Sequence, residues 1–174
     1  MRYTALEREV EIRAFSSADS AEEVNRLFHT PHALLADTML RRFWIDALVG
    51  GETPPETPRG ELIVAESETG LIGAMVFFDA ENTSGCPFYD RPNVASLGAF
   101  AVQPAFQGHG LGSAMLEYAE ERARETGADE LAVEIAPDMP HALNKFLKEG
   151  YRYAENANWA DCGKKCVILH KNLA

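Results

Sequence analysis

The sequence predicts an α/β (α+β) fold: a single domain over residues 1–174, built on a mixed sheet with helices on its faces. The chain has 174 residues, which suits one domain and leaves little room for a second. Strands joined by a short turn come first, and a strand–helix–strand unit follows. This order is typical of a sheet that combines antiparallel and parallel neighbours.

In the N-terminal part, apolar and polar residues alternate over Val10–Phe15, which predicts a strand. Ser17 or Asp19 is expected to cap a helix through Ala21–His29. A second helix is expected over Pro31–Val49, because its apolar residues recur near helical spacing. A loop rich in proline and glycine follows.

The rest of the chain alternates between strand and helix patterns. Further strands are expected at Glu61–Glu66, Leu71–Phe78, Val94–Val102, Glu130–Ile135, Tyr151–Asn156 and Lys165–Lys171. Helices are expected at Gly110–Thr126 and Pro140–Glu149, each followed by the glycine that often ends a helix. A polar loop at Glu81–Asn93 separates the first two of these strands from the third.

Composition narrows the function classes. The net charge of -11 disfavours nucleic acid as a partner, because phosphates would be repelled. It would attract a cationic acceptor such as an amine, but the favoured interpretation is that the acidity only keeps the protein soluble. No apolar run approaches the roughly 20 residues of a membrane span, and the N-terminus has no apolar leader, so a cytoplasmic protein is expected. Cys162, Cys166 and His170 supply only three loosely spaced ligands, so no metal is expected.

A glycine-rich turn joins the expected strand Val94–Val102 to the helix that follows. Glycines recur at Gly108, Gly110 and Gly112 as this helix begins. Glycines let the backbone approach a ligand closely, and the first N–H groups of a helix are unpaired at its positive end. The segment is therefore expected to bind an anion, most naturally a phosphate or pyrophosphate.

Two other interpretations of the glycines remain open. They could serve only tight packing, although three at alternate positions exceed what a turn needs. They could also begin a dinucleotide fingerprint, but Ser113 stands where its third glycine or alanine belongs, and a hairpin precedes the motif. A Walker A loop is excluded, because the Gly-Lys-Ser/Thr is missing.

The segment closely resembles the acetyl-CoA motif of the GNAT N-acetyltransferase superfamily. The matching pattern is Val102-x-Pro-x-x-Gln107-x-x-Gly110-x-Gly112 after a strand, and the similarity is clearest over Val94–Tyr151. The resemblance implies a mostly antiparallel sheet of about seven strands with helices on both faces. It also implies that the sheet splits between the parallel strands Val94–Val102 and Glu130–Ile135, and that coenzyme A occupies the split.

Cofactor contacts follow from the same resemblance. The backbone of the loop would hold the pyrophosphate, and the end of the preceding strand would hydrogen-bond the pantetheine arm of acetyl-CoA. The residues concerned are Phe100, Ala101 and Val102 on the strand, and Gln107, Gly108, His109, Gly110, Leu111, Gly112 and Ser113 in the loop and helix start. Asn144 on the short helix is a further candidate contact, or else a solvated helix residue.

Glu134 is the candidate general base. It is the carboxylate in the middle of the otherwise apolar strand Glu130–Ile135, where burial is unfavourable unless a cleft or a partner is near. Desolvation would raise its pKa toward that of a useful base. Some members of the family place a catalytic Glu here, although a salt-bridged structural Glu is the competing interpretation. Asp138 and His141 are the reserves.

The short helix departs from the family pattern. Phe146 occupies the position of the family's Tyr, which protonates the departing thiolate, and Met139 replaces its Asn. Phe146 cannot donate a proton. Either the thiolate leaves unaided, water supplies the proton, or the chain is a non-catalytic CoA-binding or regulatory module. The expected acceptor is a small-molecule or peptide amine, and a homodimer is possible because family members often dimerise.

Overall fold

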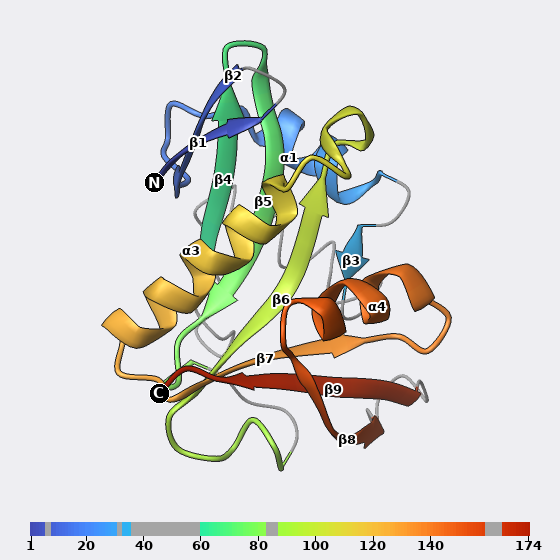
Figure 1. Ribbon diagram of the computed structural model, residues 1–174. Helices are drawn as coiled ribbons and strands as arrows, with labels where there is room; N and C mark the ends of the chain where they lie inside the picture. The colour runs from blue at the N-terminus through green and yellow to red at the C-terminus, as the bar shows by residue number, and fades with distance from the viewer. Residues whose placement is uncertain (6–7, 31–32, 36–59, 83–86, 159–164) are drawn as a thin grey trace.

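The computed structural model describes residues 1–5, 8–30, 33–35, 60–82, 87–158 and 165–174 (Figure 1). The strands are β1 (Arg2–Ala5), β2 (Arg8–Ala14), β3 (Leu34–Leu35), β4 (Glu61–Ser67), β5 (Gly70–Phe78), β6 (Val94–Val102), β7 (Glu130–Ile135), β8 (Arg152–Asn158) and β9 (Lys165–Asn172). The helices are α1 (Ala21–Phe28), the 3₁₀ turn η1 (Pro104–Phe106), α3 (Leu111–Glu125) and α4 (Pro140–Lys148).

These strands form one sheet in the order β1-β2-β4-β5-β6-β7-β9-β8, and β3 pairs with β6 off this path. Neighbouring strands are antiparallel except for β6 and β7, which run parallel. The mixed, mostly antiparallel sheet is therefore confirmed. All seven strands expected from the sequence are present, and the short strands β1 and β3 are added to them.

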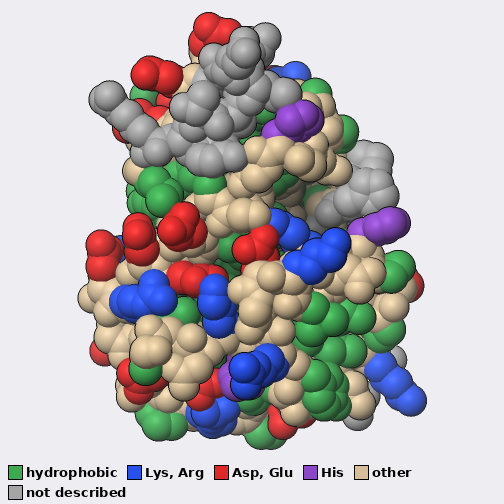
Figure 2. Space-filling view, viewed as in Figure 1, with side chains coloured by type: hydrophobic (Ala, Val, Ile, Leu, Met, Phe, Trp, Pro, Cys, Tyr) green, Lys and Arg blue, Asp and Glu red, His purple; other side chains and the backbone are tan. Residues whose placement is uncertain are grey.

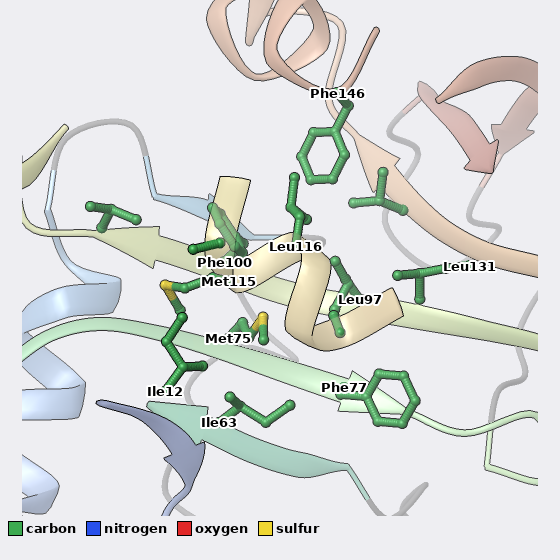
Figure 3. Packing of buried hydrophobic residues seen from close by; sticks show 14 of the residues in the cluster. Ile12, Ile63, Met75, Phe77, Leu97, Phe100, Met115, Leu116, Leu131 and Phe146 are labelled. Atoms are coloured by element: carbon green, nitrogen blue, oxygen red, sulfur yellow. The ribbon is translucent and has the colours of Figure 1, made fainter. Parts of the chain in front are cut away.

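Helices cover both faces of the sheet, as expected. On one face α3 and α4 pack over a large apolar cluster that includes Met115, Leu116 and Phe146 (Figures 1 and 3). On the other face α1 packs through Val24 and Phe28 against β5 and β6. Alternation along each strand divides its side chains between these layers, because successive residues point to opposite faces.

Two expectations for the N-terminal part are wrong. The helix expected over Pro31–Val49 does not hold at its beginning, since Leu34 and Leu35 pair with β6 as a strand, and residues 36–49 lie outside the described part of the chain. Tertiary pairing overrides the apolar spacing here. The cap of α1 is Ser20, whose side chain accepts from the N–H of Glu23. Asp19 instead binds Arg13 through both carboxylate oxygens.

Candidate functional site

The sheet opens between β6 and β7. The two strands pair only from Val94 to Leu97 on β6, where Leu97 lies opposite Val133. The next residue, Gly98, is a bulge, because Val76 pairs with Ala99 while Phe77 pairs with Leu97. A Cβ at Gly98 would lie 2.5 Å from the ring of Phe78, so only glycine fits. A bulge bends its strand, and beyond this one β6 diverges from β7 (Figure 1).

Beyond the bulge, β6 has a different neighbour on that side. Leu34 pairs with Phe100 and Leu35 with Ala99, so β3 meets the strand in the stretch that β7 has left. Phe100 and Val102 belong to the apolar cluster under α3, whereas Ala101 belongs to the cluster under α1. The side chains of the expected pantetheine-binding residues are therefore buried. Because Phe100 pairs with both β5 and β3, the strand edge away from β5 lies beyond the pairing with β3 only at Ala101 and Val102.

The glycine loop lies between the end of β6 and the start of α3. Gly108 has a φ of 78° and Gly110 a φ of 85°, both in the left-handed region that favours glycine. The loop is tied back to the strand by Gln107, whose Nε2 donates to the carbonyl oxygen of Val102 at 2.9 Å. His109 Nδ1 lies 2.8 Å from the carbonyl oxygen of Gln107. Gln107 thus positions the loop with its side chain.

The start of α3 is suited to binding an anion. The N–H groups of Ser113 and Ala114 both bond to the carbonyl of Gly110 at 3.0 Å, so those of Leu111 and Gly112 come before the first intrahelical bonds. Gly108 has open space where a Cβ would stand, and Gln107–Gly110 are exposed. Backbone donors, the positive end of the helix and an open approach coincide, which fits a pyrophosphate.

Glu134 is the first residue of β7 beyond its pairing with β6. Its side chain is only 3% exposed. Leu131, Val133 and Ile135 point into the cluster under α3, so Glu134 points to the opposite face together with Ala132. On that face Phe88 and Tyr89, from the loop between β5 and β6, pack against Ala132. The structure thus places a buried carboxylate beside the sheet opening.

The reserve candidates have different surroundings. Asp138 and His141 are exposed, at the turn before α4 and in its first turn. Asn144 is exposed on α4. Desolvation makes a carboxylate a stronger base, so the buried Glu134 is a better candidate than the exposed Asp138 and His141.

Phe146 is part of the core. It is 1% exposed, and its ring centroid lies 6.3 Å from that of Phe100 and 5.1 Å from that of Tyr151, both edge to face. Figure 3 shows it pointing from α4 toward Phe100 and Leu116. The position where the family carries its acid therefore supplies only packing.

A polar cluster beside the glycine loop was not foreseen from the sequence. Lys145 on α4 donates to Ser113 Oγ and to Glu149 Oε1, each at 2.5 Å, and Ser113 Oγ donates to the same carboxylate oxygen at 2.6 Å. Burial would raise the pKa of Glu149, but the hydrogen bonds from Lys145 and Ser113 outweigh it and lower that pKa. The i,i+4 spacing of Lys145 and Glu149 was the available signal.

No group of three or more His, Cys, Asp or Glu side chains in the described part of the chain is arranged to hold a metal ion. Cys166 is buried, and Cys162 lies outside the described residues. Across the same ranges, none of the helices combines the length and apolar character that a membrane span requires.

The sequence matches the model of one protein family over most of its length. The model described as the Acetyltransferase (GNAT) family matches residues 19–151, from the turn before α1 through α4 to the start of β8. The chain belongs to the GNAT acetyltransferase family. The match includes the glycine loop, the sheet opening and Glu134. No curated protein sequence matches the chain.

Solved acetyltransferase structures share the fold of this chain. An acetyltransferase from Bacillus subtilis in complex with CoA is 20% identical, with a TM-score of 0.66 over 95% of this chain and 99% of that one. A GNAT family acetyltransferase from Elizabethkingia anophelis with acetyl-CoA bound is 16% identical, with a TM-score of 0.66 over 94% and 97% of the two chains. At these identities the likeness shows the fold alone.

Proposed function

We propose that this GNAT protein transfers the acetyl group of acetyl-CoA to an amine acceptor. The observation that carries the proposal is the glycine loop at the start of α3, with left-handed Gly108 and Gly110, which follows the end of the strand β6 that diverges from β7. Acetyl-CoA supplies an activated thioester when bound. The loop fits its pyrophosphate, and the end of β6 beyond its pairing with β3, at Ala101 and Val102, would lie along the peptide-like pantetheine arm.

Glu134 is the proposed base. It stands at the opening, on the face opposite α3, so an amine that approaches from that face would meet it before the thioester. The amine nitrogen forms a bond to the thioester carbon, the carbon–sulfur bond breaks, and the amine proton passes to Glu134, directly or through water. The products are the acetylated amine and the thiolate of CoA.

Thiolate departure requires no protein acid in this proposal. Phe146 has no proton to give, and a thiol of ordinary pKa, about 8.5, is an acceptable leaving group near neutral pH. The same residue favours one alternative, a non-catalytic CoA-binding module of the same fold, since a fold kept only for binding needs no acid.

Thiol release separates these two functions. The full-length protein is incubated with acetyl-CoA and a panel of small-molecule and peptide amines, and free CoA thiol is measured against an enzyme-free control. Amine-dependent release is expected. Binding of acetyl-CoA without release by any amine would favour the binding module, and absence of binding would contradict both functions.

A further inference from the structure

Lys145 stands out among the cations near the glycine loop. A Cβ added at Gly112 would lie 3.6 Å from the Cε of Lys145 and 3.7 Å from the ring of Phe100. The stem of Lys145 therefore runs alongside the last glycine, and its ammonium reaches Ser113, one residue further. A helix on the far side of the sheet opening thus brings a positive charge to the start of α3.

The partners of this ammonium are partly exposed. The side chains of Lys145 and Glu149 are 36% and 26% exposed, and Glu149 shares one oxygen between Lys145 and Ser113. Lys171 makes a useful contrast, because it holds both oxygens of Glu120 at 2.8 Å and that carboxylate is 10% exposed. Half-solvated ion pairs are weak, so Lys145 exchanges partners at less cost than Lys171.

Charge at this point has a consequence for an anionic ligand. Glu149 is an acid at the edge of a site that fits pyrophosphate, and hydrogen bonding lowers its pKa, so it is ionised at neutral pH. A carboxylate disfavours a neighbouring phosphate, whereas an ammonium favours it. Figure 2 shows acidic and basic side chains gathered together across the middle of the face that carries α3 and α4.

We infer that Lys145 is a specificity-determining residue for the pyrophosphate of CoA, held by Glu149 and Ser113 in the free protein and turned to the phosphate when the cofactor binds. Glu149 is its competing counter-ion. The two side chains therefore act on cofactor affinity in opposite directions. This inference rests on the proposed function, since it assigns a further role within the same site.

The test measures affinity by calorimetry for CoA, for dephospho-CoA, which keeps the pyrophosphate, and for pantetheine, which has no phosphate. Lys145→Gln is expected to weaken CoA and dephospho-CoA binding by about 10- to 100-fold, the range for a charged hydrogen bond, and to leave pantetheine unchanged. Glu149→Gln is expected to tighten CoA binding several-fold. Lys148→Gln, an exposed lysine on the same helix, is the matched control and should change nothing.

Other outcomes would overturn the inference. Equal weakening of all three ligands by Lys145→Gln would indicate a structural role, and loss of the effect with dephospho-CoA would assign the lysine to the 3′-phosphate instead. Weaker CoA binding by Glu149→Gln would mean that the cluster only positions the loop. If the wild-type protein binds CoA and Lys145→Gln binds it equally well, the inference alone is refuted. If the wild-type protein does not bind CoA, the proposed function is refuted as well. Thermal melts without ligand check that each variant folds.

Discussion

The glycine loop and the end of β7 border the same sheet opening, but they are built in different ways. The loop, with Gly108 and Gly110 in left-handed conformations, is a local structure whose capacity for an anion comes from its own backbone. Glu134 depends on distant segments: it lies at the opening only because Gly98 bends a different strand away from it. Anion binding by the loop is therefore lost when its backbone conformation changes, whereas the role of Glu134 is lost when its carboxylate alone is replaced.

Gly110→Asp should have the largest effect, because it attacks the loop. The variant places a side chain at a φ of 85° and adds negative charge where phosphate is expected to bind. Acetyl-CoA at one hundred times its dissociation constant should stabilise the wild-type protein by about 2–3 kcal/mol, seen as a rise in melting temperature. This rise is expected to be lost completely in the variant. Gly127→Asp, with a φ of 82° and open space around it, is the matched control for strain. An unchanged shift in Gly110→Asp would remove the loop from the cofactor site.

Glu134→Gln tests the other region. The amide keeps the shape and removes the base, so the acetylation rate should fall by about 10²–10⁴ while acetyl-CoA binding stays intact. The defect should shrink at high pH, where more of the amine is already neutral. Glu130→Gln, on the same strand, is the control: Glu130 pairs with Arg91 and His170, so stability should fall without a comparable loss of rate. Parallel loss of cofactor binding would indicate that Glu134 is structural, and a near-native rate would return attention to Asp138, His141 or solvent.

Phe146→Tyr restores the family's residue and should have a smaller effect on catalysis. Because Phe146 is enclosed by Phe100 and Tyr151, the new hydroxyl is expected to cost roughly 1–3 kcal/mol of stability if it finds no partner. Little or no increase in turnover is expected, measured together with the melting temperature. A gain above roughly a hundredfold would show that proton delivery limits the native enzyme, contrary to unaided thiolate departure.

Tyr151→Phe should have the smallest effect. The Tyr151 hydroxyl is buried and has no hydrogen-bond partner within the described residues. Burial, followed by the negative charge of Glu120, raises its pKa, so the group stays neutral. Removing an unpaired hydroxyl should change the free energy of unfolding by no more than about 1 kcal/mol, with the rate unchanged. A large loss of stability in chemical denaturation would reveal a partner for this hydroxyl.

Some of the site could be predicted because it depends on neighbouring residues in the sequence. Gly108, Gly110 and Gly112 mark the loop, and the alternation of β7 places Glu134 on the face opposite Val133. Hydrophobic periodicity also identifies the seven longer strands. These signals come from backbone freedom and from the two-residue repeat of a strand, which act over a few residues.

The tertiary structure decided what the sequence pattern could not. Leu34 and Leu35 have the spacing of a helix, yet they pair with β6, because an exposed strand edge offers hydrogen bonds that local propensity does not anticipate. The meeting of Lys145 with Ser113 likewise joins two helices distant in sequence. The sequence by itself determined the strands, the loop and the candidate carboxylate. Only the packed sheet determined where it opens and which charges face the opening, because both depend on contacts between segments far apart along the chain.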